Sequence, residues 1–256
     1  MPNRFIQFVK IHLRINYVLI GINVVMFLIS TVASAFLMGN FNYALLFLGA
    51  EYTPFVLGGQ VWRMMTSAFL HGSLIHLALN MYSLFIIGNL VERFYGRRKL
   101  VAIYVWTAIA GSVATLIIDV YGIWTSGGVG VVSSISIGAS GAIFGMVGVL
   151  IGNRFRSSTY EPQINIDTQQ LIYLVIYNML IGVGLNVVGG SSFINIWAHV
   201  GGFIAGLALG VFLSTMNAFY LPKWKKILTS ILSYSAIIIL IGSFAGLIYY
   251  SITNIF

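Results

Sequence analysis

Long apolar runs, separated by short polar segments, occur from one end of this chain to the other. A helix of ~20 apolar residues crosses the ~30 Å hydrocarbon core of a bilayer, and lipid accepts only structures whose backbone polar groups are satisfied internally. The runs predict seven membrane-spanning helices, at about 17–37, 73–91, 100–118, 140–153, 171–188, 196–215 and 227–252. Because 59% of the residues are hydrophobic and only 7% are charged, a soluble domain is excluded. We expect an all-α, polytopic membrane bundle.

The runs divide the chain into three parts. Residues 1–16 are basic and apolar and are expected to lie at the membrane surface. Residues 17–215 form a six-helix core, and residues 216–256 add a basic turn and one C-terminal helix. Within the core, residues 38–72 are a long, aromatic and mostly uncharged loop, which we expect on or partly in the bilayer.

The basic residues indicate an orientation rather than a nucleic-acid partner. The formal charge of +8 is scattered between the spans, whereas nucleic-acid binding needs it gathered on one face. With the N-terminus inside, one side receives Arg4, Lys10, Arg14, Arg93, Arg97, Arg98, Lys99, Arg154, Arg156, Lys223, Lys225 and Lys226. The other side receives only Arg63. We predict a multi-pass cell-membrane protein whose N-terminus is cytoplasmic and whose C-terminus is outside.

Two glycine-rich segments predict a close pair of helices. Residues 137–152 place Ser140 at a helix start, where free N–H groups and the helix dipole favour negative charge. The glycines of this helix recur at steps of four, three and four, and lie at Gly141, Gly145, Gly148 and Gly152. In the sixth run, the glycines on the face of His199 are Gly202, Gly206 and Gly210. Small residues let helices approach closely in lipid, so the two stripes are expected to bring His199 to Ser140.

Four polar groups are expected to share the outer half of the bilayer. Ser140 opens one span, His199 lies one turn into another, and His76 and Asn80 lie four residues apart on one face of a third. A neutral histidine is the usual base for a serine near pH 7, and Asn80, His76 and the Ser140 N–H could stabilise an oxyanion. No Asp or Glu is expected in the outer half of any span, so the pair would be a dyad.

Other intramembrane chemistries need residues that the chain lacks. A zinc protease needs HExxH or a similar ligand set, and His71 with His76 has neither the spacing nor the carboxylate. An aspartyl protease needs two intramembrane aspartates, and Asp119 near a span end is the only candidate. The chain has no cysteine. No metal and no cofactor are expected.

Together these residues resemble the rhomboid family of intramembrane serine proteases, in the bacterial form with a six-helix core and one added C-terminal helix. The resemblance is carried, in the family's order, by Trp62 and Arg63, residues 71–80, Glu92 and Gly96, residues 138–141, and Ala198, His199, Gly202 and Gly206. It implies that Ser140 is the nucleophile and His199 the base. It also implies that His76, Asn80 and the Ser140 amide form the oxyanion hole.

The resemblance further implies a partner and a substrate pocket. Family substrates are membrane-spanning helices cut near their outer ends, so transmembrane proteins and the lipid bilayer are the expected partners. Phe144 stands where some members have tyrosine, and its ring can stack on His199 and floor the pocket. The other pocket or supporting residues are His71, Gly138, Gly141, Trp62 and Arg63, and helix packing is assigned to Gly145, Gly148, Gly202 and Gly206.

Two other functions remain as alternatives. A catalytically silent rhomboid-like protein would bind membrane helices without cutting them, although retention of the serine, the histidine and the oxyanion donors argues against it. A transporter would have charged residues or broken helices at the bilayer midplane, and none are apparent. For the protease, residues 126–136 and 188–195 are the candidate substrate gate, since neither is expected to have regular structure.

Overall fold

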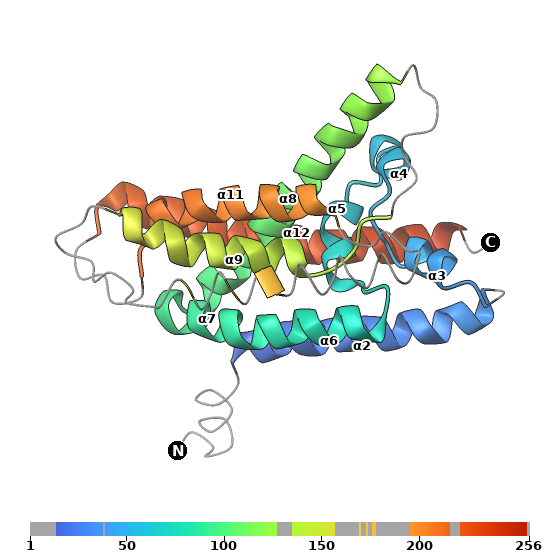
Figure 1. Cartoon of the computed structure of the whole chain (residues 1–256), viewed down its shortest axis with the longest axis horizontal. Coiled ribbons are helices and arrows are strands. Elements are labelled where there is room, and N and C mark those ends of the chain that lie inside the picture. Colours follow the sequence, from blue (N-terminus) through green and yellow to red (C-terminus); the bar gives the residue numbers. More distant parts are fainter. Residues whose placement is uncertain are drawn as a thin grey trace, which may run out of the picture.

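The chain folds into a bundle of long helices in this computed structural model (Figure 1). The structure describes residues 14–37, 39–126, 135–156, 169, 173, 176–177, 195–215 and 221–254. Within these ranges the regular secondary structure is helical, and helices are joined by turns and irregular segments, with one isolated antiparallel bridge between Glu51 and Ser136. The predicted all-α membrane bundle is confirmed. The predicted span at 171–188, the N-terminal lead and the two candidate gate segments lie wholly or largely outside the described residues.

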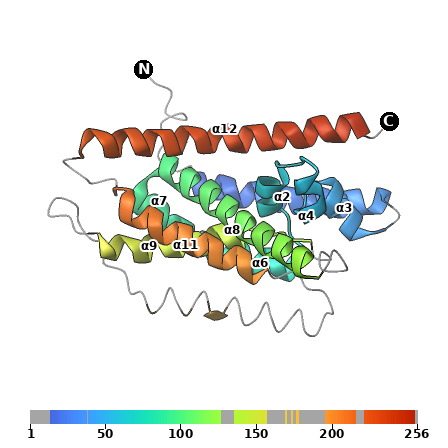
Figure 2. The ribbon, with the colours of Figure 1, turned by 90° about the horizontal axis from the view of Figure 1, so that it is seen from above.

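Four helices in the described part of the chain are long and apolar enough to span a membrane. They are α2 (Ile15–Phe36), the composite helix Leu74–Tyr95, α8 (Arg97–Thr125) and α12 (Lys223–Asn254). The composite helix consists of α6 (Leu74–Ser83), the π-helical stretch η2 (Leu84–Gly88) and α7 (Asn89–Tyr95). Two shorter apolar helices are α9 (Ser140–Gly152), which continues into η3 (Asn153–Phe155), and α11 (Ile196–Phe212). In Figure 2, α12 lies along one side of the bundle and α9 lies toward the other.

Two segments that lie outside the predicted spans, at 92–99 and 222–226, were expected to be charged turns and are largely helical. In the charged segment 92–99 only Gly96 lies outside a helix, between the end of α7 and the start of α8. Its φ of 81° is left-handed and therefore suits glycine. The predicted basic turn at 222–226 is wrong, because α12 begins at Lys223, directly after Pro222. A proline restricts the chain at a helix start without costing a hydrogen bond there. The third span is also longer than predicted, since α8 ends at Thr125 rather than 118.

The predicted first loop is a chain of short helices around Arg63. They are α3 (Phe41–Phe47), α4 (Thr53–Leu57), α5 (Arg63–Thr66) and the 3-10 helix η1 (Ser67–Phe69). The Arg63 side chain is buried and donates hydrogen bonds to Gln60 Oε1 at 2.7 Å, Leu46 O at 2.7 Å and Ala50 O at 2.9 Å. Trp62 packs on Tyr250 of α12, with ring centroids 5.6 Å apart. Arg63 therefore stabilises the first loop through hydrogen bonds to three of its residues.

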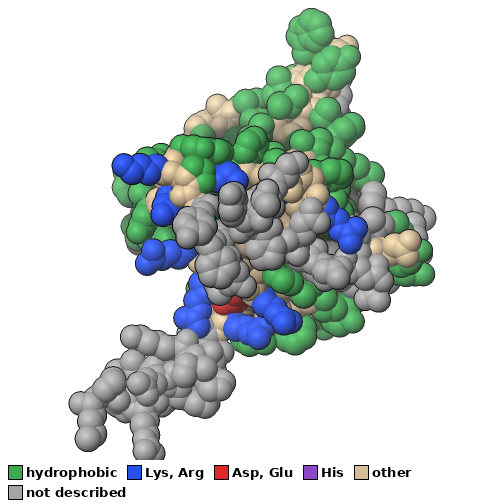
Figure 3. Space-filling model, turned by 90° about the vertical axis from the view of Figure 1, so that its left-hand side faces the viewer, with side chains coloured by type: hydrophobic (Ala, Val, Ile, Leu, Met, Phe, Trp, Pro, Cys, Tyr) green, Lys and Arg blue, Asp and Glu red, His purple; other side chains and the backbone are tan. Residues whose placement is uncertain are grey.

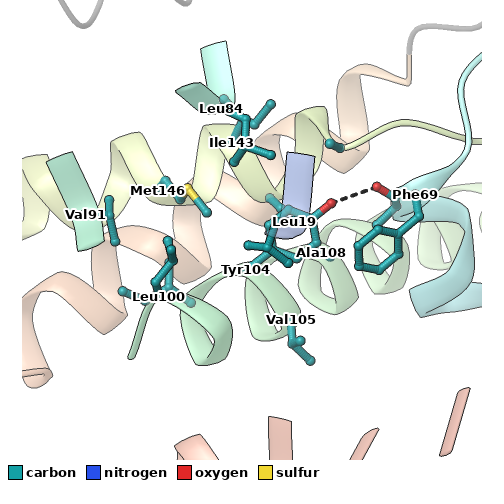
Figure 4. Packing of buried hydrophobic residues seen from close by; sticks show 14 of the residues in the cluster. Leu19, Phe69, Leu84, Val91, Leu100, Tyr104, Val105, Ala108, Ile143 and Met146 are labelled. Carbon is teal, nitrogen blue, oxygen red and sulfur yellow. Dashed lines mark hydrogen bonds between the residues drawn. The ribbon is translucent and has the colours of Figure 1, made fainter. Parts of the chain in front are cut away.

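The hydrophobic core lies where α2, α8 and α9 meet. Leu19, Tyr104 and Met146, one from each helix, are almost completely buried (Figure 4). The Tyr104 hydroxyl donates a 2.9 Å hydrogen bond to the carbonyl of Ala68 at the end of the first loop. Phe69 stacks obliquely on Tyr104, with centroids 5.3 Å apart. The core thereby fixes the residues that lead into α6.

Candidate active site

Ser140 and His199 meet at the starts of two helices. Ser140 is the first residue of α9, and His199 lies in the first turn of α11. The distance between Ser140 Oγ and His199 Nε2 is 2.7 Å, which is a hydrogen bond. The Phe144 ring stacks flat on the imidazole, with centroids 4.3 Å apart and an interplanar angle of 3°. The serine and the histidine therefore stand in the geometry of a nucleophile and its base.

The glycine stripes explain why α9 and α11 come so close. A Cβ atom added to Gly202 would collide with the carbonyl oxygen of Gly141, and one added to Gly206 would collide with that of Gly145. A Cβ on Gly148 would likewise collide with the carbonyl oxygen of Phe203. Backbone thus touches backbone along the pair. This close packing determines how far apart the Ser140 and His199 side chains can lie.

Gly145 has a second role that the stripe did not predict. A Cβ atom there would collide with the side chain of Thr107 on α8. The Thr107 hydroxyl donates to Ile103 O at 2.6 Å within its own helix. The face of α9 that was predicted to meet one helix therefore serves two, because α8 also packs on it.

His76 and Asn80 approach the serine from α6. A Cβ atom on Gly138 would lie 2.8 Å from His76 Nε2 and 3.7 Å from Ser140 Oγ, so His76 and Ser140 border the same small space. Gly138 has a φ of 120°, which a residue with a side chain rarely adopts. Asn80 Nδ2 donates one hydrogen bond, of 2.9 Å, to His76 O. The amide retains a second N–H that could be directed at a substrate oxygen.

His71 supports His76 rather than Ser140. It is fully buried, and its ring meets that of His76 edge to face, with centroids 5.0 Å apart. Burial lowers the pKa of His71 well below its ordinary value, and the nearby His76 lowers it further. A neutral ring at this place holds His76 against Gly138. Arg63, in contrast, donates hydrogen bonds within the packed first loop, and Trp62 packs on Tyr250 of α12.

Two carboxylates lie nearer the site than the sequence predicted. Because α8 continues past the predicted span end at 118, Asp119 lies within that helix. Asp119 Oδ2 accepts a 2.5 Å hydrogen bond from Thr53, not from the histidine. His199 Nδ1 has no hydrogen-bond partner among the residues that the structure describes. Among the described residues, therefore, no acidic side chain orients the His199 ring.

The other carboxylate, Glu51, belongs to a polar network directly behind Ser140. A cavity of about 20 Å³, large enough for a single water molecule, is lined by Glu51, Ser67, Ser112, Ser136, Ser140 and Asn195. Ser112 Oγ donates a 2.5 Å hydrogen bond to Glu51 Oε1. The Glu51 and Ser136 backbones exchange hydrogen bonds of 3.2 Å and 2.9 Å. The first loop is thus joined to the segment that leads into Ser140.

Asn195 connects the same network to the helix of His199. Its Oδ1 caps α11 by accepting from the N–H groups of Trp197 at 3.0 Å and Ala198 at 3.2 Å. Its Nδ2 donates to Thr115 Oγ1 at 2.8 Å and to Ser136 Oγ at 3.2 Å. Our sequence reasoning missed this role of Asn195. Its position just before an apolar run was the available signal, because asparagine is a preferred helix cap.

Replacing Glu51 with glutamine is expected to flatten the pH dependence of stability between about pH 4.5 and pH 8. Burial, with a smaller effect from Asp119, raises the pKa of Glu51 from 4.5 to about 8. The folded protein then binds this proton more tightly than the unfolded chain does. Its stabilising effect is complete below pH 4.5 and is lost as the pH rises to 8, by up to ~1.4 kcal/mol per pH unit. Glutamine stays neutral throughout.

The measurement is the detergent-micelle unfolding free energy of both proteins at several pH values in this window. We expect the wild-type protein to lose stability toward pH 8 and Glu51→Gln to lose clearly less. Parallel curves for the two proteins would show that Glu51 does not hold the proton.

The described residues show no site for a metal. No three His, Cys, Asp or Glu side chains among them lie close enough together to bind an ion.

Comparison with known proteins finds one matching family model and several related chains. A family model described as the Rhomboid domain matches residues 58–216. RHOMBOID-like protein 5 of Arabidopsis thaliana is 32% identical over 163 residues, which cover 64% of this chain and 47% of that protein. Rhomboid protease GluP of Bacillus subtilis is 29% identical over 238 residues, covering 93% and 40%. Rhomboid protease AarA of Providencia stuartii is 31% identical over 173 residues, covering 65% and 61%. The chain spans less than half the length of the first two relatives.

Proposed function

The chain belongs to the rhomboid family, and from that premise we propose that it is an intramembrane serine endopeptidase that cuts transmembrane segments of membrane proteins near their outer ends. The observation that carries the proposal is the 2.7 Å hydrogen bond between Ser140 Oγ and His199 Nε2. Two relatives named as rhomboid proteases, GluP and AarA, support the same chemistry. No cofactor or metal has a part in it.

In the proposed reaction, Ser140 Oγ attacks the carbonyl carbon of the scissile peptide bond while His199 Nε2 takes its proton. The negative charge that develops on the carbonyl oxygen is stabilised by the Ser140 N–H, His76 and Asn80. Collapse of this intermediate breaks the C–N bond, and His199 gives the proton to the leaving amine. Water then attacks the acyl carbon of the acyl-serine ester while His199 takes a proton from it, and the departing Ser140 oxygen takes that proton back from His199. The stacked Phe144 ring fixes the orientation of the His199 imidazole while the imidazole exchanges the proton.

We also propose the orientation that the sequence suggested. The N-terminus is cytoplasmic, the C-terminus is outside, and the active site opens toward the outer face. Figure 3, which shows the left-hand end of the bundle of Figure 1, supports this assignment. Lys and Arg side chains gather at that end, as they do on the cytoplasmic side of membrane proteins. The family match covers residues 58–216, and its end supports the proposal that the core of 17–215 ends at 215 and is followed by the additional helix α12.

A fluorophosphonate probe separates a protease from a catalytically silent helix binder. Such a probe reacts with a serine hydroxyl only where a base and an oxyanion site activate it. We expect the purified protein in detergent micelles to be labelled and Ser140→Ala to remain unlabelled. The readout is the labelled residue, identified by peptide mass spectrometry. Absence of label on Ser140 in folded wild-type protein would favour the silent binder.

A further inference from the structure

A large open cavity lies at the basic end of the bundle. Its volume is about 710 Å³, and it is bordered by the start of α2, the turn between α7 and α8, and the first turns of α12. The charged side chains that line it are Arg14, Glu92, Arg93, Arg97, Arg98 and Lys99. Figure 3 views this end and shows blue side chains around a red one. The cavity therefore holds five cations against a single carboxylate.

The single carboxylate is already bound within the protein. Glu92 accepts 3.0 Å hydrogen bonds from the backbone N–H groups of Ile15 and Asn16 at the start of α2. Arg97 Nε lies 3.6 Å from its Oε1. Arg93 and Arg98 have no hydrogen bond or ion pair with a described residue, and both are exposed. Positive charges gathered in one concavity repel one another unless an anion joins them.

Helix α12 forms one wall of the cavity, where it contributes hydroxyl groups, and it carries an exposed apolar stripe. Thr229, Ser230, Ser233 and Tyr234 line the cavity and can donate hydrogen bonds. From this point an exposed apolar stripe runs along α12 at alternating steps of four and three, through Ile227, Ile231, Tyr234, Ile238 and Ile241. Residues at these steps share one helix face. A ligand that matches both features has an anionic head and a long apolar tail.

We propose that this cavity binds the phosphate headgroup of an anionic phospholipid of the adjacent leaflet, with the acyl chains along the stripe on α12. Arginine guanidinium groups pair with phosphate oxygens at fixed geometry, and basic pockets between membrane helices bind such headgroups. The general excess of Lys and Arg on a cytoplasmic side explains the number of charges, but not their convergence on a cavity. The site does not depend on the proposed proteolysis. It gives α12 a function outside the rhomboid core.

The test compares two double variants that lose the same charge. Full-length protein in a neutral detergent is titrated with fluorescent phosphatidylglycerol, and with phosphatidylcholine as the neutral lipid. Arg93→Gln/Arg98→Gln is expected to weaken phosphatidylglycerol binding by about tenfold or more. Lys223→Gln/Lys226→Gln removes two exposed charges of α12 that do not line the cavity, and should weaken binding by less than about twofold.

Three results would overturn the proposal. Equal weakening by the two double variants would mean that the lipid senses only overall charge. Equal binding of phosphatidylcholine would mean that the headgroup charge is not recognised. Displacement of the lipid by inorganic phosphate at a similar concentration would mean a site for soluble anions. Arg93→Lys/Arg98→Lys keeps the charge but loses the guanidinium geometry, so it should bind more tightly than the glutamine variant and less tightly than the wild-type protein. Intermediate binding of this kind separates loss of the site from loss of the fold in the glutamine variant.

Discussion

Replacing Ser140 with alanine is expected to reduce cleavage of a transmembrane substrate by about 10⁴-fold or more, to the background rate. In the proposed reaction the Ser140 hydroxyl forms the acyl intermediate and gives its proton to His199, and the alanine variant lacks this hydroxyl. The fold should persist, because the residue loses one oxygen atom and keeps its Cβ. The measurement is the initial cleavage rate of a single-span substrate reconstituted with the protein in liposomes.

A matched control distinguishes the nucleophile from other serines. Ser235→Ala removes a hydroxyl that bonds to Ile231 O at 2.6 Å and to Leu232 O at 3.3 Å, both in its own helix α12, and should leave the rate within about twofold. The double variant Ser140→Ala/His199→Ala should be no slower than Ser140→Ala alone, since residues that act as a unit are not additive. Clear cleavage by folded Ser140→Ala would refute the proposed mechanism.

Gly206→Ala is expected to destabilise the protein by about 2–4 kcal/mol, although it adds only one methyl group. That methyl would collide with the carbonyl oxygen of Gly145, and backbone cannot move aside as a flexible side chain can. The two helices must therefore separate. Separation would also lengthen the distance from Ser140 to His199, so the cleavage rate should fall along with stability.

The same substitution at Gly21 is the control. Gly21 lies in α2, and a Cβ atom there has nothing within 4 Å. Gly21→Ala should leave the unfolding free energy unchanged or raise it by up to ~1 kcal/mol, because alanine favours helix. Unfolding in mixed detergent micelles measures both proteins. Similar free energies for the two variants would mean that the helix contact does not depend on glycine at 206.

The helices and the central pair of residues could be predicted because local patterns encode them. Apolar runs long enough for a bilayer specify the spans, and glycine spacing specifies which faces of α9 and α11 approach. The structure does bring Ser140 and His199 together, with Phe144 stacked on the ring. Each of these features depends on the residue pattern of one or two segments, and each pattern can be recognised without knowing the rest of the fold.

The polar network could not be predicted because its members come from separate segments. Glu51, Ser112, Ser136 and Asn195 are far apart in the chain, and no spacing rule connects them. Arg63 looked like a charge on the outer side, yet it is buried and bonded to carbonyls of its own loop. The end of α8 could not be predicted either, since nothing in the local sequence stops the helix at 118.

The contact between the main chains of α9 and α11 has a consequence for how a substrate gains entry. Carbonyl groups of one helix occupy the space where side chains of the other would stand. Interiors packed this densely do not deform gradually. The hydroxyl and the imidazole are therefore carried on a single rigid unit, aligned before any peptide arrives. For the proposed protease, room for a peptide substrate therefore has to come from a wall of the bundle other than the contact between α9 and α11.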